Sequence, residues 1–339
     1  MPYYSGTASS FIDLRTALVD ACQLHGWTWD SSNLILSKGA LFYKIDYQAN
    51  ASNSPESLVF RSGTGVSGGV LTNVSTVTPR MGRERHNAYD PTWPMNYSIH
   101  IFTDPDEVYF VARHSVNMFY WATFGKSDTP GLTGTGAYLS ANFCYNAAST
   151  YSGGSDYSAI YNFSLSASSF SAGIGPNYYT STYSSGMFFA NTVGPYTAVS
   201  STFGLYKQDT IHTGLTSTYG GWNGTPNAAT DTSPGMCSAM KYLQELLWSQ
   251  PNAWNNEAIL LPINIYENIT TTTVALVHTA KHARYVRVDY YEPEQIITLG
   301  PDKWKIYPFI KKNAQFPTST TNAQGHTGCL GWAIRYDGS

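Results

Sequence analysis

Charged side chains are scarce in this chain. Asp, Glu, Lys and Arg make up 12% of its 339 residues, about half of the ~25% that is usual in soluble domains. A disordered chain is excluded, because such chains are rich in charge and poor in aromatic residues, whereas aromatics supply 15% here. The formal net charge of −3, with scattered Lys and Arg, argues against a nucleic-acid binder, which would carry a basic stripe.

Long apolar runs, a secretory leader and closely spaced cysteines are also missing. No run of 18 apolar residues occurs, so we expect no membrane insertion. The first ten residues, MPYYSGTASS, have neither a basic segment nor an apolar core, so we expect no signal peptide. Cys22, Cys144, Cys237 and Cys329 are too widely spaced for a metal motif or a disulfide framework. We therefore expect the thiols to be reduced and mostly buried, and the chain to fold in a reducing cytosol.

Motifs that would indicate an enzyme are absent too. The letters G-x-G-x-x-G occur at Gly63–Gly68, but Val70–Thr78 is β-branched, so we expect a loop between strands and no nucleotide site. His278 and His282 have a spacing that suits zinc only on a helix, and their flanks favour strands. We therefore place Lys281 and His282 in a turn, and predict no catalytic, cofactor-binding or metal-binding residues and no enzyme activity.

Titratable residues gather on one predicted hairpin, which contains His100, Asp104, Asp106 and His114. Alternation puts His100 on the opposite strand face from Ile99, and we expect these polar groups to face a partner or solvent. An acid–base or metal role for this group stays an alternative. Another is sugar binding or cleavage by a pair of carboxylates in or beside the aromatic-rich middle of the chain. Those carboxylates are Asp156, Asp209 and Asp231.

Periodicity predicts an α+β fold, mainly antiparallel β with a few short helices and low-charge Tyr/Ser/Gly-rich loops. Helical spacing of apolar residues covers Ser10–Gly26, where Ser10 and Asp13 resemble a capping box and Gly26 is a natural terminator. A second helix is predicted at Met236–Ser249. The predicted strands are Leu34–Tyr47 (two strands around Lys38-Gly39), Leu58–Phe60, Tyr97–Thr103, Val108–Ala112, Met118–Phe124, Ile259–Tyr266, Thr272–His278, Arg284–Tyr291, Trp304–Phe309 and Leu330–Tyr336.

Three regions follow from this pattern. Residues 1–137 form a helix with an antiparallel sheet, residues 138–235 a Tyr/Ser/Gly-rich insertion or interaction region, and residues 236–339 a helix with a C-terminal sheet. An alternative is that the first and third regions fold together as one body. Leu14 and Leu18 need an apolar partner, and we expect the first helix to cover one face of the C-terminal sheet.

Several segments resemble a family of virion proteins from tailed bacteriophages and prophages. They are PDEVY at Pro105–Tyr109, followed by a Trp and then FGKSDTPGLTGTG, the long C-terminal segment Ala283–Asn313, and HTGCLGWAIRYDG at His326–Gly338. The start adds GWT and LSKG after a short amphipathic helix. The resemblance spans most of the chain and is weakest over Tyr138–Thr230. It brings no catalytic residues.

The resemblance implies a structural part of a phage tail or baseplate, located in the virion and assembled in the host cytoplasm. Its partners would be other tail or baseplate proteins and further copies of itself. The alternative is a host-facing adhesin that binds, or even degrades, surface glycan. Low-charge Tyr-rich surfaces are typical of protein contacts, and the residues that we single out as interface candidates are aromatic. They are Trp93, Tyr151, Tyr157, Tyr178, Tyr179, Tyr183, Trp222, Trp332 and Tyr336.

Overall fold

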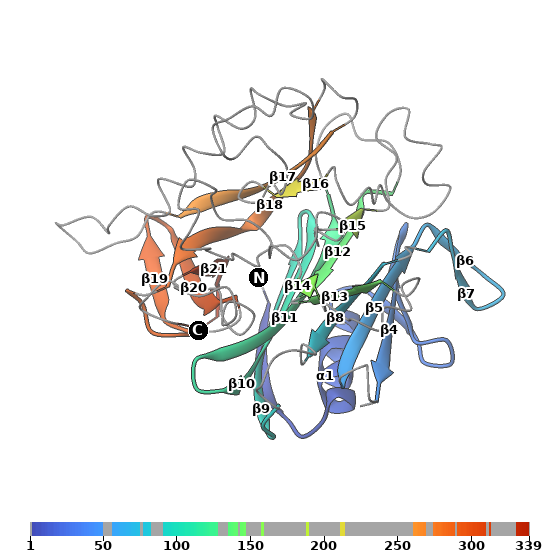
Figure 1. The fold of residues 1–339 in the computed structure, drawn as a ribbon, viewed down its shortest axis with the longest axis horizontal. Coiled ribbons are helices and arrows are strands. Elements are labelled where there is room, and N and C mark those ends of the chain that lie inside the picture. Colours follow the sequence, from blue (N-terminus) through green and yellow to red (C-terminus); the bar gives the residue numbers. More distant parts are fainter. Residues whose placement is uncertain are drawn as a thin grey trace.

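The computed structural model describes residues 2–49, 56–74, 77–82, 91–127, 135–141, 143–146, 157–158, 188–189, 211–213, 260–268, 274–288, 290–309, 312 and 330–338. Over these residues the chain is mainly antiparallel β-sheet with one helix, as the sequence predicts. Figure 1 shows a central sheet that lies between an N-terminal sheet and a C-terminal sheet. The predicted helix at Met236–Ser249 lies outside the described residues.

The helix α1 (Phe11–Gln23) begins and ends close to where its sequence signals predict. Ser10 Oγ accepts a hydrogen bond from the Asp13 backbone N–H at 3.0 Å, and the Asp13 carboxylate accepts one from the Ser9 N–H at 3.1 Å. These bonds satisfy two donors at the helix start. Gly26 then turns the chain at a φ of +81°, which glycine adopts without a Cβ clash.

The central sheet contains both the predicted hairpin and the first residues of the chain. Its order is β1-β9-β10-β11-β12-β15. The turn at Asp104-Pro105 joins β9 to β10 as predicted. Tyr3 pairs opposite His100, so the N-terminal segment is also a strand, which the sequence did not predict. The strands are β1 (Tyr3–Ala8), β9 (Met95–Thr103), β10 (Asp106–Ser115), β11 (Met118–Lys126), β12 (Ala137–Ala141) and β15 (Phe188–Phe189).

The N-terminal sheet has the order β14-β13-β8-β5-β4-β3-β2, and a separate two-stranded ribbon, β6-β7, extends from it. Gly68 and Gly69 form the ribbon's turn, both at positive φ. The glycine-rich segment therefore forms part of this two-stranded ribbon. The bounds are β2 (Thr28–Asp30), β3 (Ile35–Lys38), β4 (Leu41–Gln48), β5 (Ser57–Gly63), β6 (Gly65–Ser67), β7 (Val70–Thr72), β8 (Val77–Gly82), β13 (Phe143–Asn146) and β14 (Tyr157–Ser158).

Both faces of the central sheet are buried, because alternate side chains of each strand enter two different cores. On one face, α1 is wedged between the central and N-terminal sheets, and Leu14 and Leu18 pack in the same cluster as Ile99 and Phe110. In that core the Phe124 ring lies 4.9 Å from the ring of Tyr43. Burying a side chain of this kind stabilises the fold by roughly 1.5–3 kcal/mol.

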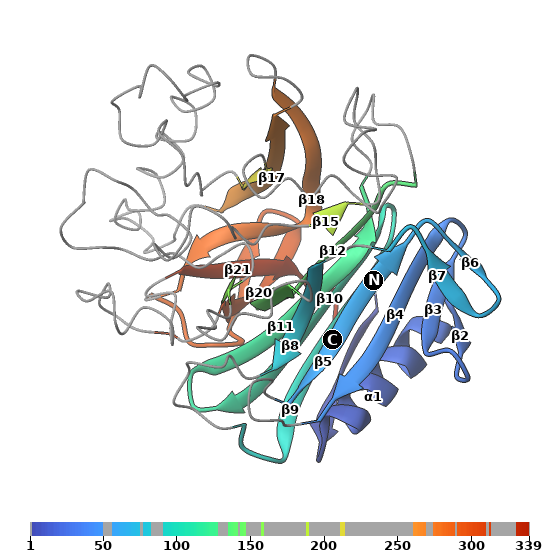
Figure 2. The same cartoon turned by 45° about the vertical axis from the view of Figure 1, so that its right-hand side comes forward.

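The C-terminal sheet covers the other face of the central sheet, on the opposite side from α1 (Figure 2). Trp332 is 1% exposed, and its ring centroid lies 4.9 Å from that of Trp121 and 5.5 Å from that of Tyr109. The described parts of residues 1–137 and 236–339 thus share an interface. In sheet order the strands are β16 (Ile211–Thr213), β17 (Leu261–Asn268), β18 (Val274–Arg287), β21 (Leu330–Arg335), β20 (Asp302–Pro308) and β19 (Ile296–Leu299).

Two expectations about the C-terminal sheet are wrong. The strands predicted at Thr272–His278 and Arg284–Tyr291 are largely one strand, β18, and Lys281 and His282 lie inside it rather than in a turn. Their backbone N–H groups donate to the buried Glu107 carboxyl of β10, which explains how this polar pair sits within a strand. The sheet is also covered by the central sheet and not by α1.

Candidate functional site: the polar interface between the central and C-terminal sheets

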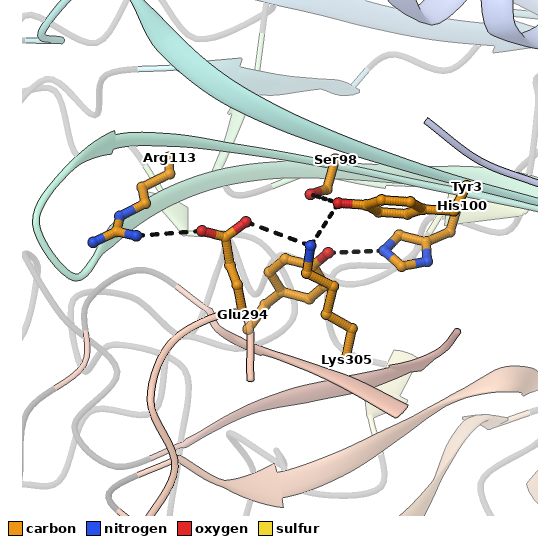
Figure 3. Close-up of polar contacts among 7 residues, drawn as sticks. Tyr3, Ser98, His100, Arg113, Glu294 and Lys305 are labelled. Atoms are coloured by element: carbon orange, nitrogen blue, oxygen red, sulfur yellow. Dashed lines mark hydrogen bonds and ion pairs between the residues drawn. The ribbon is translucent and has the colours of Figure 1, made fainter. Parts of the chain in front are cut away.

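A chain of polar contacts joins the two sheets (Figure 3). Lys305 Nζ of β20 donates to the Tyr3 hydroxyl of β1 at 2.5 Å, and that hydroxyl lies 3.0 Å from Ser98 Oγ of β9. The same Nζ lies 3.7 Å from the Glu294 carboxylate, which also accepts from Arg113 Nη1 at 3.3 Å. The charges alternate in sign along this row, so each one is partly compensated by its neighbour.

His100 extends the row deeper into the inter-sheet interface. Its Nε2 lies 2.9 Å from the Tyr307 hydroxyl, and both side chains are buried. Burial, with a smaller effect from the Lys305 charge, lowers the His100 pKa to about 3. The imidazole is therefore neutral at pH 7 and serves as a hydrogen-bonding link between β9 and β20.

Glu107 forms the second polar link between the sheets. Its carboxyl is fully buried and accepts the backbone N–H groups of Lys281 at 2.9 Å and His282 at 3.0 Å, and the Tyr109 hydroxyl at 2.9 Å. Burial raises the pKa of Glu107 to about 7, against the opposing effect of these hydrogen bonds. A carboxyl with such a pKa could act in acid–base chemistry, but here both oxygens are occupied by groups of the same chain.

The other buried histidines of the described residues are neutral for the same reason. Burial lowers the pKa of His278 to about 3, and those of His114 and His282 to about 4. The His282 ring stacks on Phe102 at 4.0 Å, and the His114 ring stacks on Tyr120 at 4.0 Å. These imidazoles pack as aromatic rings, which at neutral pH leaves them no proton to donate as acids.

The four titratable residues predicted on the hairpin do not converge. His100 faces the C-terminal sheet, whereas His114 stacks in the core on the opposite face of the central sheet. Asp106 pairs with Lys38 at 2.6 Å, and the largely exposed Asp104 lies 3.6 Å from Lys281. The expectation of a partner-facing or solvent-facing group is wrong for both histidines, because each is covered by the chain's own layers.

The predicted interface aromatics fall into two groups. Trp332 and Tyr336 are buried within the chain, and Trp93 is half-buried with its ring edge-on to Phe11 at 5.1 Å. The aromatic surfaces of these three are largely used inside the fold. Tyr157 lies in β14, and the remaining candidates fall outside the described residues. They are Tyr151, Tyr178, Tyr179, Tyr183 and Trp222, together with the carboxylates Asp156, Asp209 and Asp231.

Sequence reasoning did not single out Tyr3, Lys305 or Glu294, because up to 302 residues separate the contacting pairs. Among the described residues, no three His, Cys, Asp or Glu side chains gather as a possible metal site. The described helix α1, with 13 residues, is too short to span a bilayer. No family model and no curated protein matches this chain.

Proposed function

We propose that this chain is a non-enzymatic structural protein of a bacteriophage virion, a part of the tail or baseplate assembled in the host cytoplasm. One observation carries the proposal: the segments that resemble the phage family meet in the inter-sheet interface. PDEVY supplies Glu107 and Tyr109, the long C-terminal segment supplies Lys305 and Tyr307, and the last segment supplies Trp332. The segments that resemble the phage family therefore contain residues that hold the two sheets together.

The use of the polar groups supports a role without catalysis. The Glu107 carboxyl and the His100 imidazole, the buried groups best suited to proton transfer, bond to groups of the same chain. These two side chains therefore hold the central and C-terminal sheets together through their hydrogen bonds. A layered body from a chain with few charged residues suits a part that works through contacts with neighbouring tail or baseplate proteins and with other copies of itself.

The location is tested on purified particles. Mass spectrometry of gradient-purified virions should detect this chain at constant stoichiometry to the major tail proteins, and a cryo-EM map should allow it to be traced in the tail. Deleting its gene should yield particles with defective tails. Its absence from washed particles, or normal infectious particles without it, would contradict the proposal.

The absence of enzyme activity is tested separately on the isolated protein. Incubation with host polysaccharide, peptidoglycan and casein should release no products. Turnover that is abolished in Asp106→Asn or Asp156→Asn would overturn this part of the proposal, while leaving the location in the virion to the particle experiments.

The second candidate is a host-facing, glycan-binding tail protein. The composition of residues 138–230 favours it, since this stretch is rich in Tyr, Ser, Gly and Asn and poor in charge. A glycan array probed with the full-length chain tests the second candidate, because an adhesin should be retained specifically on host polysaccharide. An array without such retention would contradict the adhesin and leave the structural role to the particle experiments.

A further inference from the structure

A cavity of about 160 Å³ opens on the outer side of α1, away from the inter-sheet interface. We call it the helix-side cavity. Arg15, Val19 and Asp20 of α1 form one wall, and Trp29 of β2, Ser31 and Leu34 form the other. Val19 is buried, and the Trp29 side chain is half-buried.

Four polar groups around this cavity have no partner among the residues that the structure describes, whereas a fifth, the Thr16 hydroxyl, donates to the Ile12 carbonyl at 3.0 Å. Among the described residues, none forms a hydrogen bond or ion pair with the Arg15 guanidinium, the Asp20 carboxylate or the Trp29 indole N–H. The Ser31 hydroxyl is unpaired in the same way. The contrast with the inter-sheet interface is marked, because there Glu107 uses both of its oxygens. Donor and acceptor groups thus line the same cavity as the Trp29 indole.

The backbone at the cavity is also unusual. Leu34 has a φ of +58°, a left-handed conformation that is uncommon for a residue with a bulky side chain. Its carbonyl is fixed by the Ile45 N–H at 2.9 Å. Strained backbone that is held in place in this way concentrates at ligand-binding walls.

We propose that the helix-side cavity binds a single neutral pyranose sugar. The C–H face of the ring would stack on the Trp29 indole, whose amphipathic ring suits such contacts. The sugar hydroxyls would donate to the Asp20 carboxylate and accept from the Arg15 guanidinium and the Trp29 N–H. The bonds to Asp20 and Arg15 would be charge-assisted. The presence of one positive and one negative side chain favours a neutral ligand, since an anion drawn to Arg15 would be repelled by Asp20.

The size of the cavity limits the ligand. Sites for drug-sized molecules start at roughly 300 Å³, so this cavity admits one ring and its substituents. A ligand of that size with few apolar atoms binds weakly, with a Kd on the order of 1 mM. Useful affinity would then come from several copies of the chain binding one polysaccharide.

This inference goes beyond a structural role and does not depend on it, because binding is measured on the isolated full-length protein. Saturation-transfer NMR would use the methyl pyranosides of glucose, galactose, mannose, rhamnose and N-acetylglucosamine, with acetate as the anionic probe. We expect at least one sugar to receive saturation and to shift one indole N–H signal. The Trp29→Phe variant assigns that signal to Trp29.

Two variants locate the site. Asp20→Asn keeps the shape of the side chain, and Arg15→Ala removes the guanidinium; both lie on the outer side of α1. Each should raise the Kd about tenfold, the usual effect of losing a hydrogen bond to a charged group. Gln23→Ala, exposed on the same helix and not one of the residues that line the cavity, should leave the Kd unchanged.

Three results would overturn the inference. They are no saturation of any of the five sugars, binding of acetate in preference to sugars, and sugar binding that Asp20→Asn and Arg15→Ala leave intact. The melting temperature shows whether each of the two variants folds. If one of them does not fold, the other alone tests the site. Failure here leaves the particle experiments on the proposed function untouched.

Discussion

Acidification should destabilise this protein steeply between pH 6 and pH 5. Four buried histidines (His100, His114, His278 and His282) have folded-state pKa values of about 3 to 4, below the ordinary value of 6.5. Their contribution to stability is therefore present above pH 6.5 and is lost as the pH falls toward the folded-state pKa, because unfolding lets each ring bind a proton.

Glu107 acts in the opposite direction. Burial raises its pKa from 4.5 to about 7, so the folded state holds a proton that the unfolded state releases. Its contribution is present below pH 4.5 and is lost as the pH rises through 7. Near pH 5.5, unfolding thus takes up four protons on imidazoles and releases one from this carboxyl.

The net uptake of three protons by these five groups sets the expected slope, and the lowered pKa of His25 acts in the same direction as those of the four buried histidines. One proton changes the free energy of unfolding by ~1.4 kcal/mol per pH unit, so we expect a loss of about 3–4 kcal/mol between pH 6 and pH 5. Domains are typically stable by only ~5–15 kcal/mol. The measurement is urea unfolding followed by circular dichroism at pH 7, 6 and 5, with ionic strength held constant.

Two variants should change this slope in opposite directions. His100→Gln removes one imidazole and should make the slope shallower by roughly 1 kcal/mol per pH unit, whereas Glu107→Gln should make it steeper by about the same amount. A stability that is flat between pH 6 and pH 5, or two variants that shift the slope in the same direction, would refute the assignment of these charge states.

Three further predictions concern the packing of the layers. Leu14→Ala should lower the free energy of unfolding by roughly 2–5 kcal/mol, since Leu14 is fully buried; Ile12→Ala, at an exposed position of the same helix, should cost far less, and equal melting temperatures would contradict this. Gly331→Ala should lower the melting temperature and disrupt β21, because a Cβ there would run into the carbonyl oxygen of Tyr307; an unchanged melting temperature would show that the strands can separate freely. Truncation after Thr327 removes β21 and should give insoluble protein or tails that fail to assemble; a soluble product that supports infectious particles would count against it.

Local chemistry made part of the fold predictable. Ser10, Asp13 and Gly26 set the limits of α1 within one turn of chain, and the hairpin turn at Asp104-Pro105 needs only neighbouring residues. Alternation also placed His100 on the face opposite Ile99. Each of these features depends on residues a few positions apart, which is the range over which sequence patterns are informative.

Long-range pairing was beyond such patterns. Nothing in YYSGTA shows that β1 pairs with β9, since its polar and small residues resemble a loop. Lys281 and His282 resemble a turn until the carboxyl of Glu107, 174 and 175 residues away, is seen to accept their N–H groups. The same distance hid the Tyr3–Lys305 contact.

The placement of the C-terminal sheet on the central sheet has a consequence for synthesis. The central strands up to Lys126 leave the ribosome roughly 200 residues before β21 is complete, a delay of about 10–40 s at bacterial elongation rates. During that time the face that carries Tyr109 and Trp121 has no C-terminal cover. A nascent chain in this state is a target for chaperones that bind aromatic surface. Ribosome profiling of chaperone-bound nascent chains should show occupancy that starts after Trp121 emerges and ends once β21 has emerged.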